Sequence, residues 1–212
     1  MLRVCPAHGW KARVGRLVHS CGPDMQLDPL SGWCHGIAHC HSPNFNARPE
    51  GEVVSLLVIH NISLPPGQFG TRKVQEFFRN CLDPNEHPYF ADICAMTVSA
   101  HFLIERDGGV FQFVSCNDRA WHAGVSRFDG RENCNDFSIG IELEGTDCDP
   151  YSDEQYAALA ELTLQLLRAY PGITPERIRG HCDIAPERKT DPGEAFDWAR
   201  YLAAVSHHKE SQ

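Results

Sequence analysis

The stretch from Ser152 to Tyr170 constrains the fold most, because a long helix with one apolar face must bury that face against other elements. Ser152 and Gln155 have the spacing of a capping box, a pattern that begins helices. Apolar residues then recur every three or four positions until Pro171 and Gly172 interrupt the pattern. The sequence therefore predicts a long helix here, packed on a core by one face.

Other segments have the patterns of strands. Residues 55–60 form a short apolar run that suits a strand buried on both faces, and His60 is its last residue. Residues 98–106 and 110–115 flank an Asp-Gly turn. Because an Asp-Gly pair between strand-forming runs is typical of a hairpin, we expect these two strands to be antiparallel.

Residues 137–144 alternate between apolar and other side chains, which predicts a strand with one apolar face. Glu142 and Glu144 then lie together on its other face. One of them can serve as a general base, whereas the plainer alternative is a solvated strand face that carries two acids.

Helical spacing also predicts a short helix over residues 71–82 and a final helix over about 193–205, and a brief turn is expected from Thr174. Strands interleaved with such helices imply an α/β or α+β fold, in which helices flank a central mixed β-sheet.

The chain length suits one catalytic domain, which we place at residues 32–206. Residues 1–31 have no regular period, so we expect an extension, disordered or arising from a misassigned start codon, with Met25 as the alternative start. Residues 32–49 are rich in turn formers and predict an irregular arm. Residues 207–212 are expected to be a C-terminal tail.

The composition excludes several partners and locations. The formal net charge of -9 argues against general binding to nucleic acid or anionic membranes, which needs clustered cations. The sequence has no apolar run of about 18 residues, as a membrane-spanning helix requires, and no signal-peptide pattern at its N-terminus. Ten cysteines without C-x-x-C pairs suit cytosolic thiols better than a zinc finger. We therefore expect a cytoplasmic protein.

Two histidines and an acid are candidates for metal ligation. A hydrolytic zinc site needs three protein ligands and one open position. His60 and His181 can supply nitrogen, and Asp191 can supply oxygen. Each has a plainer alternative: a buried histidine is often bonded to backbone, and Asp191 before Pro192 suits the N-cap of a helix.

Nearby residues offer the remaining parts of a hydrolytic site. Glu142 is a candidate general base, and Lys189, two positions from Asp191, can converge on the same place. Trp121, within a Trp-His-Ala-Gly motif, can form a groove wall for a sugar or peptide, or can simply pack in the core.

Four segments together carry a family resemblance. With the motifs His60 to Gly67, Trp121 to Gly124, Asn135 to Thr146 and Gly180 to Gly193, the chain resembles the AmpD family of zinc-dependent N-acetylmuramoyl-L-alanine amidases. This family is related to amidase-type phage lysozymes and peptidoglycan recognition proteins, and the resemblance covers about residues 32–205. It implies a mixed sheet flanked by helices, with zinc in a surface groove.

The resemblance also implies roles for single residues. It implies one Zn²⁺ per chain on His60, His181 and Asp191, with Glu142 as catalytic acid and base and Lys189 as the stabiliser of the transition state. The predicted substrate contacts are Asn61, Trp121, His122 and Arg131. Arg131, or alternatively Arg119, is expected to meet the carboxylates of a peptide.

The activity implied is hydrolysis of the amide between the lactyl group of 1,6-anhydro-N-acetylmuramic acid and the L-alanine of a stem peptide. We expect a monomer that acts on anhydro-muropeptides during cytoplasmic peptidoglycan recycling, which also lowers signals for β-lactamase induction in some bacteria. The rival interpretations are a non-catalytic peptidoglycan-binding module, a periplasmic amidase of the same fold and a protein that zinc merely stabilises.

Overall fold

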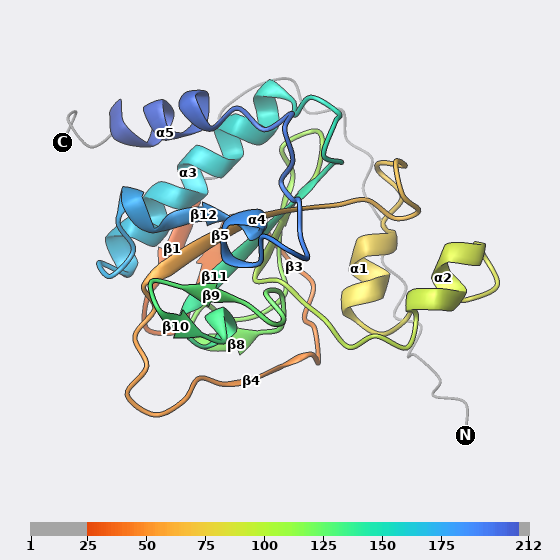
Figure 1. The fold of residues 1–212 in the computed structure, drawn as a ribbon, viewed down its shortest axis with the longest axis horizontal. Coiled ribbons are helices and arrows are strands. Elements are labelled where there is room, and N and C mark those ends of the chain that lie inside the picture. Colours follow the sequence, from red (N-terminus) through yellow and green to blue (C-terminus); the bar gives the residue numbers. More distant parts are fainter. Residues whose placement is uncertain (1–24, 208–212) are drawn as a thin grey trace.

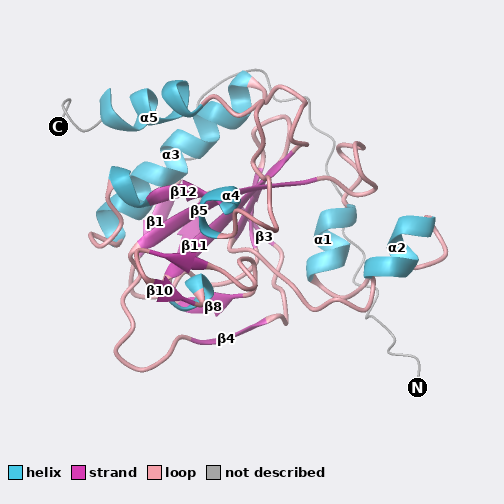
Figure 2. Ribbon diagram, viewed as in Figure 1, coloured by secondary structure: helices cyan, strands magenta, loops and turns pink. Residues whose placement is uncertain are grey.

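The chain folds around a mixed sheet of six strands, and the structure, a computed structural model, describes residues 25–207. In their spatial order the strands are β12 (Ile178–Gly180), β5 (Leu56–Ile62), β11 (Ser138–Glu144), β6 (Phe102–Ile104), β7 (Val110–Gln112) and β3 (Ala38–His39). The strands β12, β5, β11 and β6 run parallel, and β7 is antiparallel to β6. Figure 2 shows this sheet in magenta between cyan helices. The predicted fold class is confirmed.

Smaller elements surround the sheet. The paired strands are β1 (Gln26–Asp28) with β2 (Trp33–His35), β4 (Phe45–Ala47) with β8 (Asp118–Ala120), and β9 (Arg127–Phe128) with β10 (Arg131–Glu132). The helices are α1 (Lys73–Phe78), α2 (Pro88–Ile93), α3 (Asp153–Ala169), α4 (His181–Ile184) and α5 (Trp198–His207), with 3₁₀ turns η1 (Cys134–Asp136) and η2 (Pro175–Arg177). Figure 1 shows α3 and α5 side by side, with α1 and α2 at a distance from them.

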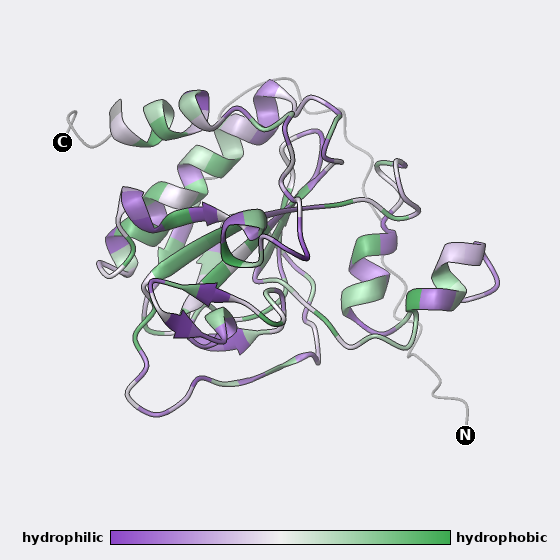
Figure 3. Ribbon diagram, in the orientation of Figure 1, coloured by the Kyte–Doolittle hydropathy of each residue, from purple (hydrophilic) through white to green (hydrophobic). Residues whose placement is uncertain are grey.

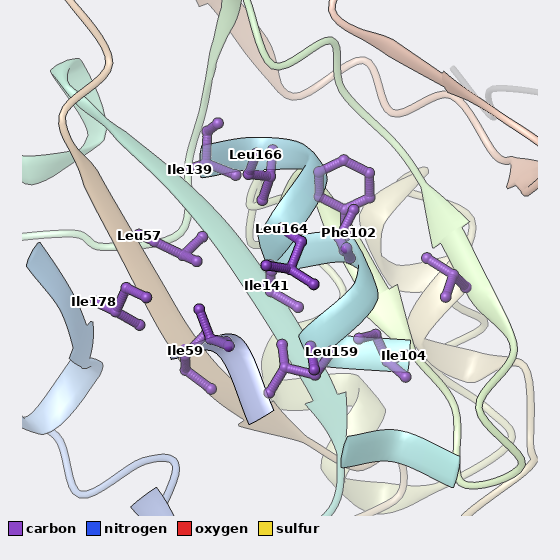
Figure 4. Packing of buried hydrophobic residues seen from close by; sticks show 14 of the residues in the cluster. Leu57, Ile59, Phe102, Ile104, Ile139, Ile141, Leu159, Leu164, Leu166 and Ile178 are labelled. Atoms are coloured by element: carbon purple, nitrogen blue, oxygen red, sulfur yellow. The ribbon is translucent and has the colours of Figure 1, made fainter. Parts of the chain in front are cut away.

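One face of the sheet packs on α3. Its capping box forms as predicted, because the Ser152 hydroxyl accepts from Gln155 N and the Gln155 side chain accepts from Ser152 N. Leu159 on this helix is fully buried among sheet residues such as Ile59 and Ile141 (Figure 4). The hydropathy colouring likewise shows the central strands as hydrophobic (Figure 3). Burial of this apolar surface holds helix and sheet together.

The opposite face of the sheet carries the polar residues of the central strands. Side chains alternate along a strand, so Leu56 and Val58 point away from α3, and so does His60. Glu142 and Glu144 are only 8% and 4% exposed. The interpretation of a solvated acidic face is therefore wrong, because loops and short elements cover this side of β11.

Several predicted elements have different limits in the structure. β5 continues to Ile62, so His60 lies inside the strand and not at its end. The predicted helix over 71–82 is limited to the six residues of α1, and the final helix starts only at Trp198. The hairpin of β6 and β7 forms as predicted, with Ile104 opposite Val110.

The N-terminal part of the described chain is more ordered than an irregular arm. β3 joins the edge of the main sheet, and β4 pairs with β8. Met25 and Leu27, which we assigned to the extension, are buried in the core beside α3. Residues 1–24 and 208–212, with most of the predicted extension and the tail, lie outside the described residues. Within residues 25–207, every helix is too short or too polar to cross a membrane.

Candidate active site

The candidate site forms where three neighbouring parallel strands approach their carboxyl ends. Glu142 on β11 is the register partner of His60 on β5. On the other side of β5, Gly180 is the partner of Ile59, so His181 follows β12 next to His60. Because the strands are parallel, residues far apart in the sequence are brought to one edge of the sheet.

Three ligand atoms converge there. His60 Nδ1 lies 3.0 Å from His181 Nδ1 and 3.0 Å from Asp191 Oδ2, and His181 Nδ1 lies 3.1 Å from Asp191 Oδ2. All three side chains are buried, and they form the one group of possible metal ligands found among residues 25–207. Because the three atoms are about 3 Å apart, one ion can lie about 2 Å from each, as zinc requires.

The protonation states favoured in the fold suit metal binding. Burial lowers the pKa of His60 to about 4, so its ring is neutral at pH 7. Burial alone would raise the pKa of Asp191, but hydrogen bonds with His181 and His60 bring that pKa below its ordinary value. A neutral imidazole and an ionised carboxylate are the forms that bind a cation.

The backbone around Asp191 is fixed from both sides. Asp191 O accepts a hydrogen bond of 2.9 Å from Cys182 N. Pro192 O accepts from Tyr151 Oη at 2.8 Å and from Asn61 Nδ2 at 3.1 Å. Asp191 is not the N-cap of the final helix, which begins seven residues later at Trp198. Its side chain is therefore available to the two histidines.

The side chain of Glu142 is buried beside these three residues. Its Oε2 atom has no hydrogen-bond partner among the described residues. Burial raises the pKa of Glu142 well above its usual value, the nearby Asp191 raises that pKa further, and Lys189 opposes them. A buried carboxyl with a raised pKa in a cavity is a frequent mark of an acid or base in catalysis.

Glu144 has a different environment from Glu142. One carboxylate oxygen accepts from Gly70 N at 2.6 Å, and the other accepts from Arg106 N at 3.3 Å. Since both oxygens already bind backbone, Glu144 holds two loops against β11.

A cavity of about 700 Å³ opens over the candidate site. His60, His181 and Asp191 line it, together with Glu142 and Lys189. Its lining includes the apolar residues Leu64, Phe77, Ile93 and Met96 and the polar residues Thr146, Asp147 and Thr190.

The predicted substrate contacts differ in whether they line the cavity and in whether their polar atoms are already bonded. Trp121 lines the cavity, and its Nε1 donates to Asn46 Oδ1 at 2.7 Å, which fixes the indole. Asn61 also lines the cavity, but its amide nitrogen donates to Asp147 Oδ1 and to the Pro192 carbonyl. The Asn61 amide is therefore engaged in holding the loop that carries Asp191.

His122 lines the cavity, whereas Arg131 does not. Both ring nitrogens of His122 are already engaged, at 2.9 Å from His60 Nε2 and 3.2 Å from Ser138 Oγ. Arg131 is outside the cavity, where it pairs with Glu52 and stacks 3.9 Å from the ring centre of Phe137. The substrate contact at Arg131 stays a prediction.

The alternative guanidinium, Arg119, forms an ion pair with Asp136 and is likewise outside the cavity. Arg188, which was not predicted from the sequence, also lines the cavity and donates to the Ala123 and Val125 carbonyls. The position of Arg188 beside Lys189 was the one available signal, since a loop residue has no periodic pattern to reveal its direction.

A sequence profile of N-acetylmuramoyl-L-alanine amidases matches residues 50–194, which include all five candidate ligand and catalytic residues. The chain belongs to this amidase family. It is similar to the 1,6-anhydro-N-acetylmuramyl-L-alanine amidase AmpD of Haemophilus influenzae, with 61% identity over 164 residues. That match covers 77% of this chain and 89% of the relative. The predictions of the family and of an enzyme are confirmed.

Solved structures of the amidase family have the same fold. A crystal structure of a selenomethionine derivative of AmpD matches with a TM-score of 0.82 and 56% identity, over 85% of this chain and 99% of that one. AmpDh3 from Pseudomonas aeruginosa, in complex with an anhydromuramic pentapeptide, matches with a TM-score of 0.57 and 31% identity. That match covers 74% of this chain and 61% of AmpDh3.

Proposed function

We propose that this amidase hydrolyses the bond between the lactyl group of 1,6-anhydro-N-acetylmuramic acid and L-alanine of the stem peptide, with one zinc ion per chain. The observation that carries the proposal is the convergence of His60, His181 and Asp191 beside the buried, unpartnered Glu142. Support for the substrate comes from the name of the similar H. influenzae enzyme and from the anhydromuramic ligand of the AmpDh3 complex.

The donor set fits zinc. Two imidazole nitrogens and one carboxylate oxygen leave a fourth tetrahedral position open, as in catalytic zinc sites. A zinc ion held there polarises a carbonyl and lowers the pKa of water toward about 7. The cavity above the three residues gives a substrate access to that position.

The side chains around this position have complementary tasks. Glu142 Oε2 takes the proton of the attacking water and delivers it to the leaving amine, since burial makes this carboxyl a stronger base than an exposed one. Lys189 lines the same cavity, and its ammonium stabilises the negative charge that develops on the amide oxygen. Trp121 offers its ring to the sugar or peptide.

We further propose a cytoplasmic role in peptidoglycan recycling, without nucleic-acid or membrane partners and as a monomer. One chain supplies every candidate residue of a single cavity, so the site needs no second copy. A non-catalytic binding module is less well supported, because binding alone would not require a buried, unpartnered acid such as Glu142.

The proposed activity is tested with purified protein. We expect about one zinc per chain by atomic spectroscopy, and zinc-dependent release of the peptide from an anhydro-muropeptide by mass spectrometry. Intact peptidoglycan serves as the competing substrate and distinguishes a wall-degrading amidase. If anhydro-muropeptide stays intact in the presence of zinc, the proposed substrate is wrong.

Changing Lys189 to Met should lower turnover while zinc binding persists. Loss of one donor to a developing oxyanion typically costs about 10²- to 10³-fold in kcat. Lys189→Arg, which retains the charge, should recover part of this loss. We would measure kcat and bound zinc for the wild-type protein and both Lys189 variants. The control is Lys73→Met, which removes the ion pairs of a lysine that does not line the cavity. Normal kcat in Lys189→Met would exclude the role.

A further inference from the structure

Both candidate metal histidines direct their outer ring nitrogens at one short segment of chain. His60 Nε2 lies 2.9 Å from His122 Nδ1, and His181 Nε2 lies 3.0 Å from the Ala123 carbonyl oxygen. We propose that the segment 121–124 fixes the orientation of both rings. This inference rests on the proposed metal role of the two histidines. His122 and Asn135 are then positioning residues that control metal affinity.

The direction of the hydrogen bonds follows from the ligand atoms. When the proposed metal ion is bound at Nδ1 of His60 and Nδ1 of His181, the ring proton of each ligand is on Nε2. His60 therefore donates to His122 Nδ1, and His181 donates to the Ala123 carbonyl. His122 in turn carries its proton on Nε2 and donates to Ser138 Oγ at 3.2 Å. The ring of His122 thus has one orientation that satisfies both of its neighbours.

Gly140 gives the His122 ring its place on the sheet. A Cβ atom at Gly140 would lie 2.5 Å from Cγ and Nδ1 of His122, which is closer than real contacts allow. The ring of His122 therefore rests directly on the backbone of β11. The His122 ring lines the cavity on one side, and the His101 ring lies 5.7 Å away in an edge contact. This packing leaves the imidazole little freedom to turn away from His60.

The backbone of the segment is held by side chains from two other places. Asn135 Oδ1 accepts from His122 N at 3.1 Å and from Ala123 N at 2.8 Å. From the other side, Arg188 Nη2 donates to the Ala123 carbonyl at 2.7 Å and to Val125 O at 2.8 Å. The Ala123 carbonyl that orients His181 is thus fixed as well.

Partners of this kind determine the tautomer and the angle of a metal-binding ring. Their loss typically weakens metal binding or activity about 10- to 100-fold. Both ring nitrogens of His122 are engaged within the protein, and so is the amide oxygen of Asn135. None of these atoms is left to bind a substrate. We therefore expect a change in zinc affinity and, for changes at Asn135, which does not line the cavity, little change in the KM for substrate once zinc is saturating.

The test uses two pairs of variants in the full-length protein. His122→Leu removes the acceptor, whereas His122→Asn keeps an oxygen near the position of Nδ1. Asn135→Ala removes the acceptor of two backbone N–H groups, whereas Asn135→Asp keeps it. Zinc dissociation constants are measured by competition with a chromophoric chelator. The exposed His35 on β2, changed to Leu, is the control.

We expect about 10- to 100-fold weaker zinc binding in His122→Leu and Asn135→Ala. The two conservative variants should recover most of the affinity, and KM at saturating zinc should not change in the Asn135 variants. Thermal unfolding of the zinc-free proteins checks that each variant folds; if His122→Leu does not, the Asn135 pair decides. The inference would be overturned if His122→Leu and Asn135→Ala bound zinc as tightly as the wild-type protein. It would also be overturned if the conservative variants bound zinc as weakly as these two. Absence of zinc binding by the wild-type protein would instead refute the proposed function.

Discussion

Glu142→Gln should reduce turnover of the anhydro-muropeptide by about 10²- to 10⁴-fold, the usual contribution of a general acid or base. Glutamine has nearly the same shape but cannot accept and return a proton. Glu142 is not one of the three converging ligands, so zinc content should match that of the wild-type protein. Initial rates by chromatography and zinc by atomic spectroscopy measure the two effects separately.

The matched control for this substitution is Glu132→Gln, which changes an exposed acid on β10 outside the cavity. It should leave turnover unchanged. Undiminished turnover in Glu142→Gln would remove the base role from this residue. Glu144 would then be a poor substitute, because both of its oxygens already accept hydrogen bonds from backbone.

His181→Ala should abolish both activity and the stabilisation of the fold by zinc. A ligand at 1,000 times its dissociation constant stabilises the native state by about 4 kcal/mol, provided that it does not bind the unfolded chain. For a domain of this size, we expect zinc to raise the Tm of the wild-type protein by about 10 °C. The variant lacks one of three ligands, so its Tm should be almost the same with zinc and with a chelator.

Differential scanning calorimetry with zinc and with chelator measures this effect, and His41→Ala, which changes an exposed histidine, is the control. The chelator should also stop the activity of the wild-type protein, and added zinc should restore it. An equal rise of Tm in His181→Ala would show that zinc binds elsewhere.

The fold could be predicted where its determinants are local. The capping box and apolar spacing of α3 lie within the helix itself, so its limits agree with the prediction to one residue. The place of β3 at the sheet edge depends on pairing with β7, more than 70 residues later, and its two residues have no alternation to read. The burial of Glu142 was missed for a similar reason, since the cover on that face comes from short segments.

The candidate site was predictable in part. The motifs identified His60, His181 and Asp191 as possible ligands, and the structure brings these residues together. The substrate contacts were harder, because the direction of a loop side chain depends on its neighbours in space. His122 faces His60 since Gly140 leaves room for its ring, and Arg131 faces Phe137 and Glu52. Neither arrangement leaves a pattern in the sequence.

The register of β5 with β11 has a consequence for how such a site can change over time. His60 and Glu142 are directly opposite each other on hydrogen-bonded strands, so sheet geometry sets their backbone separation at about 4.8 Å. Asp191 and Lys189 instead come from the chain after α4, outside any strand. Substitutions in that part of the chain can therefore shift Asp191 and Lys189. The separation of His60 and Glu142 stays the same, because the backbone of the sheet sets it.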